Sequence, residues 1–187
     1  MMSQGSVLVL STAKYFLDAI TDLCDLQGWY YSHKHRNSIK LDLVLAIQTW
    51  EKWRKFEHLL PVASIKNIYS YLGDNVTKGY QKGKTMDENE DGYYIQECMD
   101  SHGLQTDDVW YKAFAGLDTE TENYIRSMLA NKEKISQTPR ITLSTIHGAK
   151  GGEADNVLLL PDITKSAADH DDLEPDELHR LFYVAVK

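Results

Sequence analysis

The chain has 187 residues and a formal net charge of −8, with 20 Lys and Arg residues against 28 Asp and Glu residues. This length can bury one core, or one core with a small additional unit. The acidic balance argues against a protein that binds DNA nonspecifically by itself, because such binding depends on Lys and Arg at phosphates. It still allows a domain that forms one wall of a nucleic-acid channel.

Two cysteines, Cys24 and Cys98, lie far apart in the sequence and lack the spacing of metal ligands. They predict reduced thiols rather than a metal site or a disulfide framework. The sequence has no signal-peptide pattern and no apolar stretch long enough to cross a bilayer. We therefore expect a cytoplasmic protein without a membrane partner.

An apolar run over residues 7–10 predicts a first strand, and the helix-capping residues Ser11 and Thr12 follow it. Apolar residues then recur at helical spacing between residues 13 and 27, and Gly28 is placed to end that helix. The aromatic run at 29–31 predicts a second strand.

The middle of the chain has the pattern of helices. Apolar positions predict a long helix over residues 41–56, a second helix that ends before Gly73, and a third near residues 120–129. Residues 74–91 are polar and rich in glycine, as in a surface loop. We therefore predict two domains: residues 1–40 with 138–187 form a sheet domain, and residues 41–137 form a mainly helical insertion.

Three aromatic residues of this insertion, Tyr93, Tyr94 and Trp110, have two readings. They could stack on the bases of a single strand. Packing in the core of the insertion is the favoured prediction for each of them.

The most informative stretch covers residues 141–160, ITLSTIHGAKGGEADNVLLL. Two apolar runs flank a polar loop, and such runs are typical of fully buried strands in an α/β sheet. The loop contains Thr145, His147, Lys150 and Glu153 among several glycines. Ligands bind at strand ends in such sheets, so we predict that the chemistry resides in this loop.

Residues 145–153, TIHGAKGGE, resemble the T-x-H-x-x-K-G-x-E sequence that is the fifth motif of the UvrD/Rep/PcrA-like superfamily 1 DNA helicases. Residues 176–186, DELHRLFYVAV, are similar to the start of the sixth motif of the same family. Lys187 stands where the family has threonine, and the arginine that should come next is absent from this sequence.

The resemblance implies an α/β fold: the RecA-like parallel sheet of a second motor domain, incomplete here and interrupted by a mainly helical insertion. It also implies an ATP-dependent DNA helicase that moves along single-stranded DNA, by analogy from 3′ to 5′, and unwinds duplex junctions. The implied partners are single-stranded DNA, duplex junctions and a first, N-terminal RecA-like domain.

The phosphate-binding loop and acidic metal-binding strand of that first domain do not occur in this sequence; GYQKGKT at 79–85 lacks the required earlier glycine. ATP and Mg²⁺ are the implied cofactors, and the Mg²⁺ ligands are expected in the first domain. Because phosphoryl transfer needs both walls of the cleft, the fragment alone is predicted to be inactive.

For DNA, the resemblance implies contacts from Thr145, His147 and the backbone at Gly148. A hydroxyl, an imidazole and a backbone N–H can each donate to a phosphate. Without the motif, the favoured reading of His147 is a loop histidine that is hydrogen-bonded to a neighbouring carbonyl.

For ATP, the resemblance implies that Glu153 accepts from ribose hydroxyls, that Lys150 lies near phosphate and that Gly151 permits the turn between them. Gly152 departs from the aliphatic residue usual in the family, which removes no chemical group. Arg180 matches an arginine of the sixth motif with a structural or coupling role. With the final arginine absent, no catalytic residue set is complete in this chain, and no metal ligand is predicted.

Three alternatives stay open at the sequence level. The two motifs could be a glycine-rich turn and an amphipathic helix without a motor function. The chain could instead belong to the motor subunit of a helicase–nuclease or recombination complex. It could also be a degenerate, non-catalytic interaction module, which the absent arginine and Lys187 would favour.

Overall fold

The structure is a computed structural model, and it describes residues 5–33, 36–73, 76–77, 86–87, 91–135, 138–163, 165, 180 and 183. The chain divides into two compact units. The sheet unit consists of Met1–Ser38 with Tyr124–Lys187, and the helical unit consists of Ile39–Asn123. No helix among the described residues is long and apolar enough to span a membrane.

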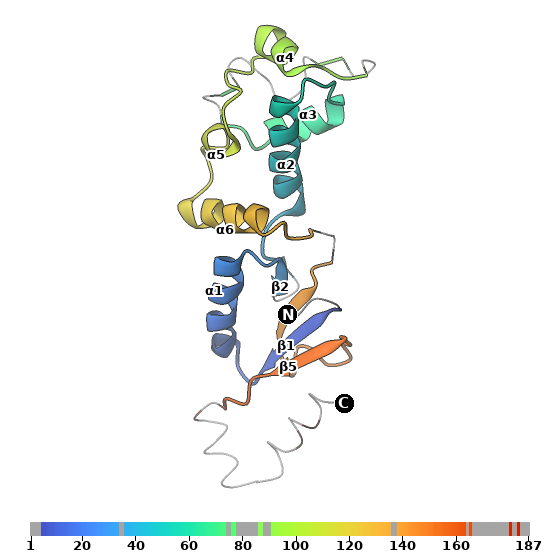
Figure 1. Cartoon of the computed structure of the whole chain (residues 1–187). Helices are drawn as coiled ribbons and strands as arrows, with labels where there is room; N and C mark the ends of the chain where they lie inside the picture. The colour runs from blue at the N-terminus through green and yellow to red at the C-terminus, as the bar shows by residue number, and fades with distance from the viewer. Residues whose placement is uncertain are drawn as a thin grey trace. The chain divides into compact units, whose positions relative to one another are not determined.

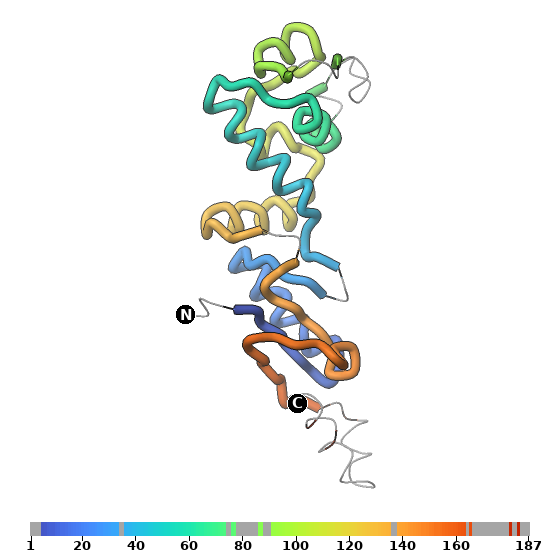
Figure 2. The backbone as a smooth tube through the Cα atoms, turned by 90° about the vertical axis from the view of Figure 1, so that its right-hand side faces the viewer, coloured from blue at the N-terminus to red at the C-terminus, as the bar shows by residue number. Residues whose placement is uncertain are grey.

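The sheet unit contains five strands, β1 (Val7–Ser11), β2 (Tyr31–His33), β3 (Arg36–Asn37), β4 (Ile141–Thr145) and β5 (Asn156–Leu159), in the order β3-β2-β4-β1-β5. All neighbouring strands are parallel except β2 and β3, which form an antiparallel pair. Strand β1, blue in Figure 2, thus lies in one sheet between β4 and β5, both orange, although more than 120 residues separate it from them along the chain. The predicted α/β class with a mostly parallel sheet is confirmed.

Strand β1 is the best-buried element of this sheet. All five of its residues are buried, because β4 pairs with one edge and β5 with the other. The one polar residue, Ser11, satisfies its hydroxyl by donating to the carbonyl oxygen of Ala13 at 2.7 Å. Burial of this run on both faces explains why its sequence is continuously apolar.

The helix predicted over residues 13–27 is present in two parts, a 3-10 turn (η1, Lys14–Leu17) followed by α1 (Asp18–Gln27). It ends at Gly28 with φ of 62°, as predicted from the sequence. Leu17 and Cys24 are the buried side chains of this segment, whereas Leu23, expected on the same side, is 42% exposed.

The second strand begins later than predicted. Residues 29–31 were expected to form it, but β2 starts at Tyr31. The backbone of Trp29 is engaged elsewhere: its N–H donates to the Cys24 carbonyl at 2.9 Å, and its carbonyl accepts from the Tyr124 hydroxyl at 2.8 Å. Because the N–H and the carbonyl of Trp29 are both bonded outside the sheet, Trp29 does not form the hydrogen bonds of a β-strand.

The prediction that residues 157–160 form a fully buried strand is wrong. Strand β5 is at the edge of the sheet, with β1 as its hydrogen-bonded neighbour, and Val157 and Leu158 are 48% and 41% exposed. An apolar run predicts a strand but does not distinguish an edge position from a central one.

Helix α6 (Thr119–Ala130) carries the chain back into the sheet unit. Tyr124 is tied to that unit by its hydroxyl, which also lies 2.7 Å from the Ser38 hydroxyl oxygen. The amide of Asn131 donates to the Gln27 carbonyl at 2.6 Å. These bonds place the boundary of the sheet unit at Tyr124, whereas the sequence suggested residue 138.

The helical unit contains α2 (Leu41–Lys55), α3 (Val62–Tyr69), α4 (Ile95–Ser101) and α5 (Trp110–Ala113) (Figure 1). The ring of Trp50 is central to its core and meets Trp53 and Phe114 edge to face, with each pair of centroids 6.2 Å apart. Trp110 is buried as predicted, but Tyr94 is 45% exposed.

Candidate functional site

The predicted chemical loop is the connection from β4 to β5, and we call residues 146–155 the return segment. Because β4 and β5 are parallel and flank β1, this segment runs back along the sheet from the carboxyl end of β4 to the amino end of β5. Three of its apolar residues, Ile146, Ala149 and Ala154, pack with Leu8 and Leu10 of β1. The return segment therefore covers one face of β1.

The first end of the return segment is held by the last residues of two strands. The N–H of Ile146 donates to the Ser11 carbonyl at 2.9 Å. Thr145 accepts twice, from Gly148 N–H at its hydroxyl oxygen (3.2 Å) and from Ala149 N–H at its carbonyl (3.0 Å). These bonds form a tight turn directly after β4.

The other end is held by a pair of residues that are distant in sequence. The N–H and hydroxyl of Ser6 donate to Asp155 Oδ2 at 2.7 and 2.8 Å, and the Asp155 N–H donates to the Ser6 hydroxyl oxygen at 3.0 Å. The pKa of the Asp155 carboxyl lies below its usual value, because the Ser6 backbone N–H and then its hydroxyl stabilise the charged form. We call this pair the Ser6–Asp155 clamp.

The charged residues of the motif lie between these two ends. His147, Lys150 and Glu153 are exposed, and within the described residues their side chains make no hydrogen bond or ion pair. The bond from His147 to a neighbouring carbonyl, which was the alternative reading, is likewise not found there. The fold thus anchors the ends of the motif and leaves its polar groups available for a ligand.

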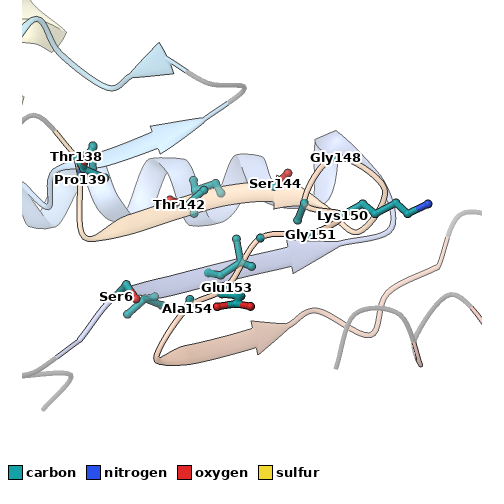
Figure 3. Close-up of a pocket in the computed structure, with 15 residues that line it drawn as sticks. Ser6, Thr138, Pro139, Thr142, Ser144, Gly148, Lys150, Gly151, Glu153 and Ala154 are labelled. Atoms are coloured by element: carbon teal, nitrogen blue, oxygen red, sulfur yellow. The ribbon is translucent and has the colours of Figure 1, made fainter. Parts of the chain in front are cut away.

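A pocket of about 420 Å³ opens between β4 and the return segment (Figure 3). Residues 148–154 form one side of it, and four of its other lining residues carry hydroxyl groups: Ser6, Thr138, Thr142 and Ser144. Thr142 and Ser144 share one face of β4 because side chains alternate along a strand. The pocket offers several hydrogen-bonding groups in a small volume, as a sugar or phosphate ligand requires.

The structure separates the residues predicted to contact DNA from Glu153, one of the residues predicted to bind ATP. Thr145 pairs with Ser11 at the carboxyl end of β1, whereas Glu153 is two residues from Asp155 at the clamp, near the amino end. At about 3.3 Å per residue, these ends of β1 lie roughly 13 Å apart. In Figure 3 the Lys150 side chain extends outward, away from Glu153. One continuous segment thus presents two distinct chemical surfaces.

Gly151 provides the change of direction between Lys150 and Glu153. Its φ is +80°, a conformation that residues with a side chain rarely adopt, and no atom lies within 4 Å of a Cβ built there. The glycine is therefore required by the backbone and not by crowding, in agreement with the turn expected at this position.

Arg180 is exposed, but the surrounding residues of the second motif lie outside the described part of the chain, as do residues 79–85. In the described part, no group of three or more His, Cys, Asp or Glu side chains is arranged to hold a metal ion.

Four residues of the site were not identified from the sequence: Ser6, Thr142, Ser144 and Asp155. The alternation of Thr142 and Ser144 with buried Ile141 and Leu143 is a signal that a second, polar face of β4 would line a site. No local pattern pairs Ser6 with Asp155, because 149 positions separate them.

Comparison with known proteins supports the resemblance in the second part of the chain. Residues 110–187 match the family model of the UvrD-like helicase C-terminal domain. No curated protein and no solved structure matches the chain. The matched region contains β4, the return segment and β5, so this part of the chain is similar to the UvrD-like helicase C-terminal domain.

Proposed function

We propose that the chain is one half of an ATP-dependent DNA motor and acts as the second wall of its nucleotide cleft. The observation that carries this proposal is the geometry of the return segment. Its two ends are fixed by backbone and clamp hydrogen bonds, while His147, Lys150 and Glu153 are exposed between them. The similarity of residues 110–187 to a helicase domain family supports the same assignment.

At the carboxyl end of β4, the proposed ligand is the backbone of single-stranded DNA. The Thr145 hydroxyl oxygen accepts from Gly148, which leaves its O–H free to donate to a phosphate. His147 adds an imidazole on the exposed side of the same turn. The resemblance implied that Lys150 binds ATP, but we assign it to the DNA side because its side chain extends away from Glu153 (Figure 3). These groups contact phosphate and therefore position the strand without reading its sequence.

Near the amino end of β1, the proposed ligand is the ribose of ATP. The exposed Glu153 carboxylate can accept from ribose hydroxyls, and two residues that carry hydroxyl groups, Thr142 and Ser144, line the adjacent pocket. Because Glu153 and Lys150 belong to one short segment, a displacement on the nucleotide side reaches the DNA side through the backbone. This coupling would convert cleft closure into movement along the strand, by analogy from 3′ to 5′.

Hydrolysis itself requires groups from the other wall of the cleft. Charge on the transferring phosphoryl group is stabilised by Mg²⁺ and by lysine and arginine side chains placed on both sides. The described residues offer no acidic group suited to Mg²⁺, so the proposed metal ligands belong to the first RecA-like domain. That domain is the proposed protein partner, and single-stranded DNA with duplex junctions is the proposed substrate.

The test compares ATP turnover by the 187-residue chain alone and mixed with the first motor domain of a UvrD-like helicase, with and without a single-stranded oligonucleotide. We expect no turnover by the chain alone and DNA-stimulated turnover by a mixture that forms a complex. Glu153→Ala should abolish the stimulated activity, while Glu57→Ala, at an exposed glutamate of the helical unit, should not.

Robust turnover by the isolated chain, lost in Glu153→Ala, would contradict the two-wall mechanism. A complex that forms but neither binds ATP nor hydrolyses it would instead favour the non-catalytic interaction module.

A further inference from the structure

The return segment is anchored more firmly at its ends than along its middle. Its amino end is bonded through Ile146 and Ala149 and packs on Leu8 and Leu10. At its carboxyl end, the side-chain bonds are those of the Ser6–Asp155 clamp, supplemented by the Asn156 N–H and side-chain amide, which donate to the Ser6 carbonyl at 3.0 and 3.3 Å. Glu153 is two residues away from this clamp.

The clamp is reciprocal, which distinguishes it from an ordinary surface contact. Asp155 accepts from both donors of Ser6 and returns its own N–H to the Ser6 hydroxyl oxygen. Because Ser6 and Asp155 each donate to the other, these bonds fix the relative orientation of the two chain segments as well as the distance between them. The residue before β1 and the residue before β5 are thereby locked to each other.

The neighbouring residue leaves room for this arrangement. Gly5 has φ of +99°, and a Cβ at this position would come within 2.7 Å of the Asp155 Cβ. Any side chain at position 5 would therefore push Asp155 away from Ser6. Gly5 thus leaves space for the Asp155 carboxylate, and Ser6 donates hydrogen bonds to it.

Nothing comparable holds Glu153 itself. The side chain is exposed and makes no hydrogen bond or ion pair among the described residues. On the amino side of Glu153, the Gly152 N–H donates to the Ala149 carbonyl at 2.8 Å and closes the turn at Gly151. On its carboxyl side, Ala154 packs with β1 and Asp155 forms the clamp, so these two residues fix the backbone that carries the Glu153 carboxylate.

We propose that Asp155 is a positioning residue: through Ser6 it holds the second half of the return segment against the sheet, so that Glu153 is presented to the ribose of a bound nucleotide. This inference rests on the nucleotide role proposed for Glu153. It adds the contact that holds the Glu153 backbone in position. Asp155 does not contact the nucleotide; it acts through the backbone of residues 153–155.

The experiment measures two properties of the 187-residue chain. The first is the order parameter of the Glu153 backbone amide from NMR relaxation. The second is the ratio of the dissociation constants of 2′,3′-dideoxy-ATP and ATP, from NMR titration, which reports the contact to ribose hydroxyls and not the overall affinity. The variants are Asp155→Ala, Asp155→Asn, Ser6→Ala and, as a matched control, the exposed Asp22→Ala of α1.

In Asp155→Ala, we expect the order parameter to fall from about 0.85 to below about 0.6. The ratio should fall to about 1, as in Glu153→Ala, which removes the acceptor. Asp155→Asn retains an oxygen that accepts from Ser6 and should restore much of both values, whereas Ser6→Ala keeps the backbone donor and should be intermediate. Asp22→Ala should match the unmodified chain, and thermal melting of every variant checks the fold.

An Asp155→Ala variant with an unchanged order parameter at Glu153 would overturn the proposal. So would a mobile segment whose ratio is unchanged, since the clamp would then serve the fold only. If the unmodified chain binds neither nucleotide by itself, the ratio is measured with the first motor domain added, because two walls are proposed to hold the nucleotide. If the two nucleotides then bind equally, the nucleotide role of Glu153 fails, and the order parameter alone decides whether Asp155 fixes the segment.

Discussion

The hydroxyl oxygen of Thr145 accepts a hydrogen bond from the N–H of Gly148 at 3.2 Å, so the last residue of β4 also closes the turn that follows it. The same residue was expected to contact DNA through its hydroxyl. The two roles are compatible because a hydroxyl accepts and donates at once. The structural role and the DNA contact can be measured separately in variants of Thr145.

Thr145→Val removes the hydroxyl and keeps the shape of the side chain. We expect a loss of about 1 kcal/mol in the free energy of unfolding, the usual contribution of one hydrogen bond, together with weaker binding of a single-stranded oligonucleotide. Thr145→Ser should retain both properties. Urea denaturation and fluorescence anisotropy measure them, and a Thr145→Val variant with normal DNA affinity would leave Thr145 a structural role only.

Lys150 makes no ion pair among the described residues, and its ammonium group extends outward from the motif. If it neutralises one phosphate, Lys150→Ala should reduce the slope of log affinity against log salt by about 0.7 for a single strand. Binding of oligonucleotides of different sequence should weaken equally. Lys40→Ala, in the helical unit, is the control, and an equal change in its slope would point to general charge and not to a contact.

The hydroxyl of Tyr124 bonds to the Trp29 carbonyl and to Ser38, at the point where the chain re-enters the sheet unit. Tyr124→Phe leaves both groups without this partner in a buried position. We expect a loss of about 1–3 kcal/mol in the free energy of unfolding. Tyr15→Phe, at an exposed position, should change stability by less than about 0.5 kcal/mol; equal losses in both variants would contradict the role given to Tyr124.

Both cysteines are buried, and burial raises the pKa of the Cys24 and Cys98 thiols to about 11. A raised folded-state pKa means that the stabilisation is complete below the unfolded value near 9 and is lost as pH rises toward 11. Chemical denaturation from pH 8 to 11 should therefore show falling stability. The buried Tyr31 and Tyr124, whose pKa values burial also raises, act in the same direction at the top of this range.

Replacing both cysteines by alanine should flatten the part of this pH profile between 9 and 10. In the unmodified chain at pH 8, neither thiol should react with a thiol reagent until the protein is unfolded. Rapid labelling of a folded thiol would show that its burial is only transient.

The main elements of the fold follow from local sequence patterns. Residues 7–10 and 141–145 gave strands because their apolar character requires burial, and Gly28 ended α1 because it adopts a positive φ. Leu41–Lys55 formed the predicted long helix because Val44, Ile47 and Trp50 recur on one side of it.

What the sequence did not reveal depends on partners that are distant along the chain. The exposure of Val157 and Leu158 follows from the edge position of β5, and the delayed start of β2 follows from the bond between Trp29 and Tyr124. Within the site, the motif identified Lys150 and Glu153 as exposed loop residues. Their separation along β1 depends on the path of the return segment, which composition and spacing do not specify.

The position of β4 between β1 and β2 has a consequence for the order of folding. When β1, α1 and β2 leave the ribosome, the strand that must separate β1 from β2 has not been synthesised, and the whole helical unit comes before it. Until residue 145 has emerged, β2 can form its native pair with β3 only, and β1 must remain unpaired or pair wrongly. Pairing over such a sequence distance is slow, so the helical unit should complete its core first and the sheet should close last, with the early apolar strands open to aggregation or chaperone binding in the interval.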